Sequence, residues 1–142
     1  MKKVFIVGGT SGFGLSLAKE FDQDHGVTVC GRKKYPAFNG IVCDMIDVSE
    51  KLFQEHNPDI IINNAFDKKD YLKSYQGSLN VLKSAFSFFK SKNKGTIINV
   101  NSISGVCPDP KDPDYAAAKY ALRGYSDSIC AEAFQKNIKI IN

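Results

Sequence analysis

The chain has 142 residues, of which 43% are hydrophobic and 24% charged, and its formal net charge is +4. This length and composition predict one compact domain with a hydrophobic core, and leave no room for a second. The basic residues form two short runs, 32–34 and 90–94, without interleaved aromatic side chains, so solvated surface is favoured over nucleic-acid binding. No apolar run is long enough for a signal-peptide core or a membrane span, which predicts a cytoplasmic protein with no membrane partner.

The cysteines and histidines exclude several kinds of site. The four cysteines lie far apart and form no C-x-x-C pair, and the two histidines have no metal-ligand spacing. Neither histidine accompanies a G-x-S-x-G motif. We therefore expect no disulfide framework, no metal site and no hydrolase triad.

Short apolar runs alternate with amphipathic stretches along the whole chain. We expect strands at 4–9, 27–30, 40–43, 59–65, 95–102 and 137–142, and helices over 12–22, near 48–56, within 70–91 and from Asp112 onward. The apolar runs are continuous rather than alternating, which is typical of strands covered on both faces. The pattern predicts an α/β fold over 1–142, with a doubly wound parallel sheet of the Rossmann type, about six strands and helices on both faces.

The first expected strand leads directly into GGTSGFG, residues 8–14, and then into an amphipathic helix. Glycines in this place let the backbone approach a pyrophosphate, while the helix N-terminus offers free N–H groups and a positive dipole end. A glycine-rich string alone can be a simple turn, but this context predicts a dinucleotide site. The candidate contacts are Gly8, Thr10, Ser11, Gly12, Phe13 and Gly14.

The residue that follows the second strand indicates which dinucleotide is bound. An NAD-specific site would place an acid there, whereas this chain has Arg32, which suits a 2′-phosphate. We therefore expect NADP(H) to be preferred over NAD(H), with a solvated surface charge as the alternative role for Arg32. Asp44, just past the third strand, is a candidate acceptor for the adenine amine, although it could equally cap a turn or helix.

Tyr115 and Lys119 are four positions apart in a stretch that Asp112 can cap and Pro113 can begin as a helix. Residues i and i+4 share a helix face, so the phenol and the ammonium are expected to be neighbours. A cation beside a phenol favours its ionised form, which makes Tyr115 a candidate proton donor or acceptor. By itself this spacing favours a surface tyrosine beside a solvated lysine, so the hypothesis depends on the other motifs.

Taken together, these motifs resemble the short-chain dehydrogenase/reductase family over essentially the whole chain. GGTSGFG resembles the family's T-G-x-x-x-G-x-G loop, with Val7 in place of Thr, and INNAF (62–66) resembles its N-N-A-G motif. GTIINVNSISG (95–105) resembles the strand that ends in the catalytic serine, and YAAAK (115–119) resembles Y-x-x-x-K.

The resemblance implies a role for each matched residue. Tyr115 would exchange a proton with the substrate carbonyl or hydroxyl, Ser102 would hydrogen-bond that oxygen, and Lys119 would bind the nicotinamide ribose. Asn64 and Ala65 would also contact the cofactor, as would Tyr115. The resemblance further implies a small-molecule carbonyl or alcohol substrate, and a homodimer or tetramer formed through the helices within 70–91 and 113–135.

The chain also departs from the family pattern. Ser74 stands where an asparagine is usual, three residues before Gly77, and Asn80 lies two turns further along the same expected helix. Phe66 replaces the glycine of N-N-A-G. The segment that usually covers the substrate after the sixth strand is absent, which suggests either a shortened chain or a minimal protein whose partner supplies the cover.

Three functions remain after these observations. The first is an NADP(H)-dependent oxidoreductase that interconverts a carbonyl and a secondary alcohol by hydride transfer. The second is a non-catalytic NADP(H)-binding sensor, or a truncated remnant of such an enzyme, as Ser74, Phe66 and the short C-terminus suggest. The third, a structural or nucleic-acid-binding domain, would explain the basic runs but not the spacing of Tyr115 and Lys119.

Overall fold

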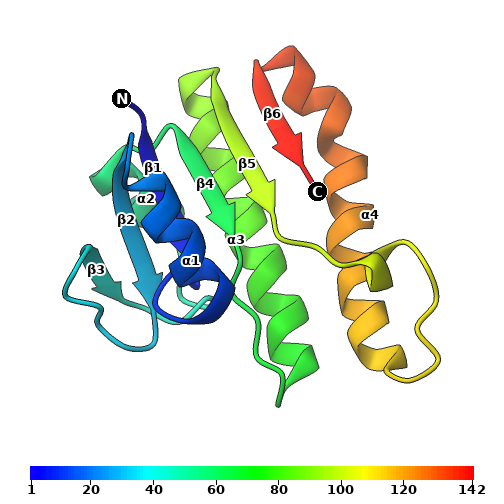
Figure 1. Cartoon of the computed structure of the whole chain (residues 1–142). Helices are drawn as coiled ribbons and strands as arrows, with labels where there is room; N and C mark the ends of the chain where they lie inside the picture. The colour runs from blue at the N-terminus through cyan, green and yellow to red at the C-terminus, as the bar shows by residue number, and fades with distance from the viewer.

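The computed structural model describes all of residues 1–142 and contains a single six-stranded sheet with four α-helices (Figure 1). In chain order the elements are β1 (Lys3–Val7), α1 (Gly12–Phe21), β2 (Gly26–Gly31), β3 (Asn39–Val42), α2 (Glu50–His56), β4 (Ile60–Asn63), α3 (Tyr71–Lys92), β5 (Gly95–Asn99), a 3-10 turn (Ile103–Gly105), α4 (Pro113–Gln135) and β6 (Ile138–Ile141). Every expected strand and helix is present, with ends that shift by a few residues.

The sheet is parallel throughout, with the strand order β3-β2-β1-β4-β5-β6. At its centre, Ile6 of β1 is in register with Val29 of β2 on one side and Ile62 of β4 on the other. This order confirms the predicted doubly wound sheet. The chain reverses its winding direction between β1 and β4, and ligands of such sheets bind at the carboxyl ends of the strands beside that point.

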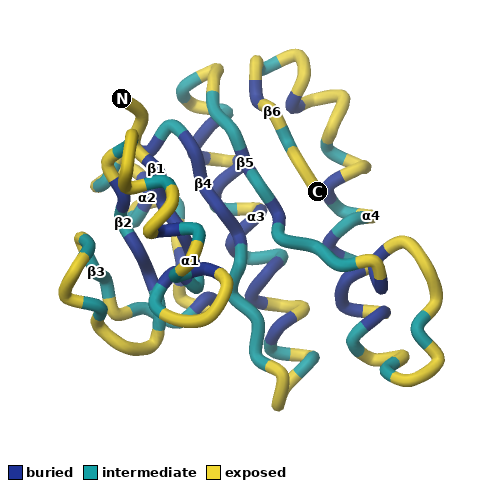
Figure 2. The backbone as a smooth tube through the Cα atoms, viewed as in Figure 1, coloured by how far each residue is buried: buried dark blue, intermediate teal, exposed yellow.

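The hydrophobic core has two parts, one on each face of the sheet. Seventeen buried residues from the strands, α2, α3, α4 and the segment before α2 form the larger part, with Phe5, Phe53 and Phe89 fully buried. Seven buried residues form the smaller part, between the sheet and α1. The central strands β1 and β4 are buried along almost their whole length (Figure 2). This explains why their sequences are continuously apolar.

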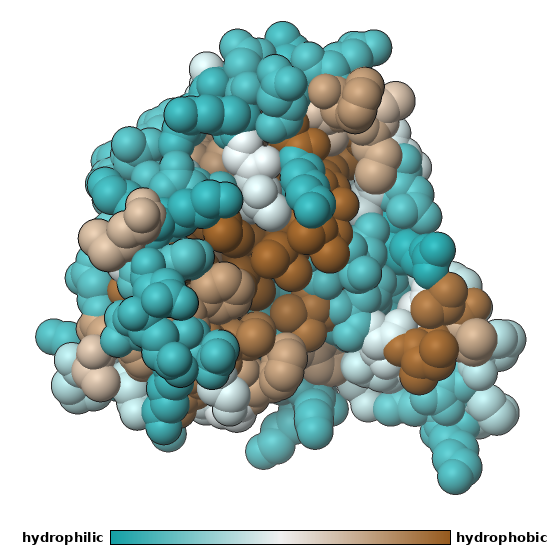
Figure 3. All heavy atoms as spheres, turned by 45° about the horizontal axis from the view of Figure 1, so that its top comes forward, coloured by the Kyte–Doolittle hydropathy of each residue, from teal (hydrophilic) through white to brown (hydrophobic).

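The face that carries α1 is covered less completely than the other. Ile98 and Val100 pack against the smaller part of the core but remain partly exposed. Figure 3 shows hydrophobic side chains gathered at the middle of the surface in that view.

Side-chain caps fix the starts of the two long helices. The Asp70 carboxylate accepts a hydrogen bond from the Lys73 N–H at 2.8 Å at the start of α3. The Asp112 carboxylate accepts one from the Tyr115 N–H at 3.1 Å at the start of α4. The predicted Asp112 cap is therefore confirmed. None of the helices is both long and apolar enough to cross a membrane.

Candidate active site

The glycine-rich turn after β1 packs directly against the loop after β4. Gly8 adopts a φ of +82°, which favours glycine, and its carbonyl oxygen accepts a hydrogen bond from the Asn64 side-chain amide at 2.9 Å. Gly14, in the first turn of α1, has no space for a side chain, because a Cβ there would overlap both the Gly8 carbonyl oxygen and the Asn64 amide. The turn and Asn64 thus support each other, and this contact depends on a glycine at position 14.

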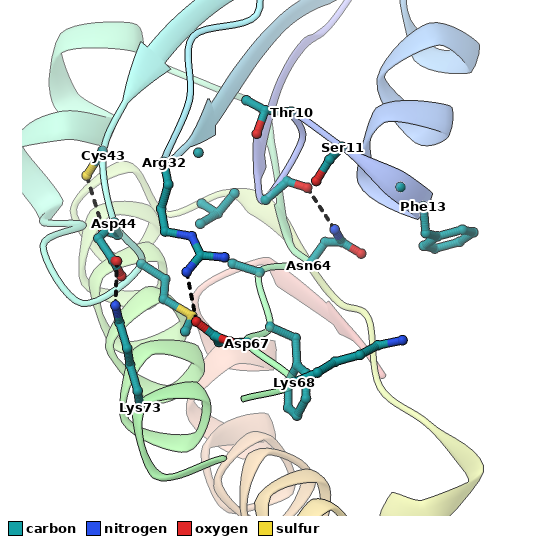
Figure 4. A pocket seen from close by; sticks show the side chains of 17 residues that line it. Thr10, Ser11, Phe13, Arg32, Cys43, Asp44, Asn64, Asp67, Lys68 and Lys73 are labelled. Carbon is teal, nitrogen blue, oxygen red and sulfur yellow. Dashed lines mark hydrogen bonds and ion pairs between the residues drawn. The ribbon is translucent and has the colours of Figure 1, made fainter. Parts of the chain in front are cut away.

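A cavity of about 420 Å³ opens beside this turn, at the carboxyl ends of β1, β2 and β4 (Figure 4). The sequence-predicted contacts that line it are Gly8, Thr10, Ser11, Gly12, Phe13, Arg32, Asp44, Asn64 and Ala65. Gly14 does not line the cavity. It is buried behind the turn, where its lack of a side chain lets Gly8 and Asn64 pack closely. A glycine-rich turn that leads into a helix N-terminus fits the pyrophosphate of a dinucleotide. These residues therefore suit the cofactor expected from the sequence.

Two ion pairs occupy the predicted adenosine end of this cavity. Arg32 contacts the carboxylate of Asp67 at 2.8 Å, and Lys73 contacts the carboxylate of Asp44 at 2.7 Å, as Figure 4 shows. The hydrogen bond from Lys73 holds the pKa of Asp44 below its usual range, and the same bond raises the pKa of Lys73. Asp67 and Lys73 were not among the sequence-predicted site residues. In the sequence, Asp67 could have been indicated only by its position directly after INNAF, and nothing indicated Lys73.

A second cavity, of about 490 Å³, adjoins the first and contains the Tyr115 and Lys119 side chains. Both cavities are lined by Phe13, Asn64, Phe66 and Lys68. The predicted acid/base pair therefore lines a cavity that adjoins the glycine-rich turn.

Lys119 is buried to an unusual degree for a lysine, since only 7% of it is exposed. Its ammonium donates a hydrogen bond to the Val100 carbonyl at 3.0 Å and lies 5.8 Å from the centre of the Tyr115 ring. Burial lowers the pKa of the Lys119 amine. The fold therefore holds a desolvated cation beside a phenol, as the motif predicts.

Phe66 lies against both members of this pair. Its ring centre is 4.8 Å from the Lys119 ammonium, and its ring meets that of Tyr115 edge to face, with centres 5.1 Å apart. Phe66 therefore points inward and crowds the place where the family resemblance puts the nicotinamide ribose.

Ser102 occupies a different position from the other two predicted catalytic residues. It precedes the 3-10 turn, and its hydroxyl oxygen accepts a hydrogen bond from the Ser104 N–H at 3.2 Å. Ser102 lines neither cavity, whereas its neighbour Asn101 lines the second one. The structure thus places Tyr115 and Lys119 in one cavity, which Ser102 does not line.

Tyr71 and Asp112 form a further part of the second cavity that the sequence did not indicate. The Tyr71 hydroxyl donates a hydrogen bond to the Asp112 carboxylate at 2.6 Å, which raises the pKa of Tyr71. Asp112 therefore caps α4 with one carboxylate oxygen and holds the start of α3 with the other.

Ser74, at the position where the family usually has asparagine, is completely buried. Its hydroxyl accepts a hydrogen bond from the backbone N–H of Asp67 at 2.7 Å and donates one to the backbone carbonyl of Asp67 at 2.9 Å. Asn80 does not replace the missing asparagine, because its amide donates to the carbonyl oxygens of Met45, Ile46 and Val48. Ser74 thus fixes the loop after β4, and Asn80 fixes the loop after β3.

The parallel sheet order and the glycine-rich turn with its adjoining cavity define a fold of the Rossmann type. Residues 44–142 match the family model described as short chain dehydrogenase, which is more than half of the chain. The chain belongs to the short-chain dehydrogenase family.

Individual relatives agree with this assignment. The chain is 25% identical to the 3-ketodihydrosphingosine reductase of Bacteroides thetaiotaomicron, in an alignment that covers 96% of this chain and 60% of the relative. Among solved structures, it is similar to a putative NAD(P) dependent gluconate 5-dehydrogenase from Beutenbergia cavernae with bound NADP. The TM-score is 0.84 at 18% identity, covering 96% of this chain and 68% of that one.

It is also similar to the 3-ketoacyl-(acyl-carrier-protein) reductase from Brucella melitensis complexed with NADH, with a TM-score of 0.81 at 21% identity, covering 96% of this chain and 72% of that one. At these identities the two structures establish a shared fold. The chain spans about three-fifths of the length of the Bacteroides relative.

Proposed function

We propose that this chain provides the cofactor site and the proton-transfer residues of an NADP(H)-dependent oxidoreductase that interconverts a carbonyl and a secondary alcohol. The observation that carries the proposal is the buried ammonium of Lys119 beside the ring of Tyr115, in a cavity that adjoins the nucleotide-binding turn. A desolvated cation next to a phenol, where a dinucleotide can reach, suits acid/base catalysis coupled to hydride transfer.

In this proposal the nicotinamide, when bound, donates or accepts the hydride. The Tyr115 hydroxyl donates its proton to the carbonyl oxygen during reduction and takes a proton from the alcohol during oxidation. Lys119 stabilises the ionised phenol and offers its remaining N–H donors to ribose hydroxyls. Ser102 lines neither cavity but directly follows Asn101, which lines the second one. In this proposal it hydrogen-bonds the substrate oxygen, because its bond from the Ser104 N–H uses an acceptor position and leaves the hydroxyl proton free.

The preference for NADP(H) over NAD(H) rests on Arg32, which lines the first cavity at the end of β2. A guanidinium suits a 2′-phosphate because it can form charge-assisted hydrogen bonds with phosphate oxygens. The structural neighbours include one protein with NADP and one with NADH. The choice therefore depends on this chain's own residues.

A second function, an NADP(H)-binding sensor without turnover, is favoured by one observation: Phe66 covers the ammonium that the nicotinamide ribose should reach. Oxidation of NADPH by the purified chain with a panel of ketones and aldehydes separates the two functions. Turnover with any carbonyl supports the oxidoreductase. Micromolar NADPH binding with no turnover on the whole panel supports the sensor.

We further propose that the chain forms a homo-oligomer through the outer surfaces of α3 and α4, acts on a small-molecule carbonyl or alcohol, and resides in the cytoplasm. All four cysteines are free, which suits a reducing compartment. A Cβ at Gly124 of α4 would meet no atom within 4 Å, so this position leaves room for a close helix contact. Sedimentation at micromolar concentration tests the association, and a monomer throughout would reject it.

A further inference from the structure

Two consecutive residues after β4, Phe66 and Asp67, cross the boundary between the two cavities. Both line the first cavity, and Phe66 also lines the second. We refer to this pair as the strap. If the proposed function holds, the strap lies where it can affect cofactor binding.

The Asp67 side of the strap holds the cation that is expected to bind the 2′-phosphate. Arg32 extends from the end of β2 across the cavity to Asp67, as Figure 4 shows, with 2.8 Å between guanidinium and carboxylate. The other carboxylate oxygen accepts a hydrogen bond from the Lys69 N–H at 3.0 Å. This bond, together with Arg32, lowers the pKa of Asp67. The carboxylate is therefore fixed by its own loop, and Arg32 reaches toward it.

The Phe66 side of the strap covers the cation that is expected to bind the nicotinamide ribose. The ring centre lies 4.8 Å from the Lys119 ammonium, a favourable cation–π distance. The ring also contacts Tyr71, with centres 5.9 Å apart, in addition to its edge-to-face contact with Tyr115. Phe66 thus packs between the Lys119 ammonium and the rings of Tyr71 and Tyr115.

Ser74 keeps the strap in this position. Its buried hydroxyl bonds both the N–H and the carbonyl of Asp67, at 2.7 and 2.9 Å, so the strap backbone is attached to α3 at both polar groups. Ser74 stands where an asparagine is usual for the family, and its hydroxyl acts both as acceptor and as donor to the Asp67 backbone. Ser74 is therefore a positioning residue for the strap.

We propose that the strap competes with the dinucleotide for Arg32 and Lys119, and that Asp67 and Phe66 thereby set the affinity and selectivity of the cofactor site. A 2′-phosphate must displace the Asp67 carboxylate from Arg32, and its dianion is the stronger partner for a guanidinium. The nicotinamide ribose must displace the Phe66 ring from Lys119. Asp67 thus competes with the 2′-phosphate end of the cofactor, and Phe66 competes with the nicotinamide ribose end. The two competitions can be tested separately.

The Asp67 half is tested with 2′,5′-ADP, which carries the 2′-phosphate but no nicotinamide, and with 5′-AMP, which lacks that phosphate. We expect Asp67→Asn to tighten 2′,5′-ADP binding about three- to tenfold in calorimetry at low salt, because the competing carboxylate is neutral. Binding of 5′-AMP should not change. The matched control is Asp127→Asn, which removes one charge from an exposed ion pair with Arg123 on α4.

The Phe66 half is tested with NADPH. We expect Phe66→Ala to tighten NADPH about three- to tenfold and to leave 2′,5′-ADP unchanged, because the ring lies at the Lys119 end of the cofactor site. Thermal unfolding of each variant shows whether it is folded. If Phe66→Ala is not folded, Phe66→Leu fills similar space without the ring face and should give the same direction of change.

The outcomes separate the strap from the proposed function. If the wild-type chain binds 2′,5′-ADP and NADPH but Asp67→Asn and the Phe66 variants bind them no more tightly, the strap does not compete and the inference is rejected, while the proposed function stands. If neither the wild-type chain nor any folded variant binds these ligands, the proposed function fails and the inference fails with it.

Discussion

The ammonium of Lys119 lies 5.8 Å from the centre of the Tyr115 ring, and both side chains line one cavity at the carboxyl end of the sheet. The two residues come from successive turns of α4, whose start is fixed by the Asp112 cap. The helix thus places the Tyr115 phenol and the buried Lys119 cation together in a cavity that adjoins the glycine-rich turn.

Burial of Lys119 predicts a cost in stability that its replacement should remove. Lys119→Met keeps the length of the side chain without the charge, so we expect the free energy of unfolding at pH 7 to rise by about 1 kcal/mol, while carbonyl reduction is lost. Urea unfolding of both proteins at pH 7 measures this. A clear loss of stability in Lys119→Met would show that the charge is well compensated in the folded chain.

The pH dependence of stability provides an independent test of the same site. Burial lowers the pKa of Lys119 in the folded chain. The unfolded chain therefore binds more protons between this lowered pKa and the ordinary value of about 10.4, and stability rises with pH across that interval. The difference in unfolding free energy between Lys119→Met and the wild type should shrink as the pH is raised from 7 to 10. If this difference in unfolding free energy stayed constant from pH 7 to 10, the pKa of Lys119 would not be lowered in the folded chain.

Gly14 should be required for cofactor binding, because its Cβ would overlap the Gly8 carbonyl and the Asn64 amide. We expect Gly14→Ala to weaken NADPH binding at least tenfold, since the turn or the Asn64 loop must move. The control is Gly124→Ala, where a Cβ would meet no atom within 4 Å on α4. That position is exposed on α4, away from the turn, so the change should leave NADPH binding unaltered. Fluorescence titration with NADPH compares the two variants, and equal affinities would contradict the structure of the turn.

Arg32 should decide the choice of cofactor. We expect Arg32→Ala to weaken NADPH binding about tenfold, since charged hydrogen bonds to phosphate are lost, and to change NADH binding less than twofold. Lys34→Ala removes a neighbouring exposed charge outside both cavities and should affect neither. Parallel losses for NADPH and NADH in Arg32→Ala would show that Arg32 does not read the 2′-phosphate.

Ser74 should contribute to stability through its two bonds to the backbone of Asp67. Ser74→Ala leaves a buried donor and acceptor without partners, so we expect the free energy of unfolding to fall by about 1–3 kcal/mol. Ser128→Ala removes a hydroxyl that bonds the Gly124 carbonyl at the exposed surface of α4, and its effect should be within about 0.5 kcal/mol. Similar small effects from both changes would show that the loop does not depend on Ser74.

Local sequence patterns sufficed for the fold and for the proximity of Tyr115 and Lys119. Continuous apolar runs such as Ile60 to Ile62 indicate strands because both faces are buried, and the Asp112 cap indicates where α4 begins. The i, i+4 spacing then fixes the relation of Tyr115 to Lys119 as soon as the helix is given. Each of these features depends on residues close together in the chain.

The features that the sequence did not indicate depend on residues far apart. Arg32 and Asp67 are 35 positions apart, and Asp44 and Lys73 are 29 apart, so their pairing follows from the sheet topology and not from any local pattern. The position of the Phe66 ring also follows from its aromatic neighbours on α3 and α4. As a result, the cations expected to bind the cofactor already have partners in this structure: Arg32 pairs with Asp67, and Lys119 lies against the Phe66 ring.

The most direct test of the central claim is NADPH oxidation with an accepted ketone or aldehyde by Tyr115→Phe, compared with Tyr120→Phe. Tyr120 lies on the same helix but is 41% exposed and lines neither cavity. If the phenol supplies the proton, as proposed, Tyr115→Phe should lower kcat by at least about a hundredfold with NADPH affinity retained, and Tyr120→Phe should match the wild type. Undiminished turnover in Tyr115→Phe would contradict the assignment of Tyr115 as the acid/base residue.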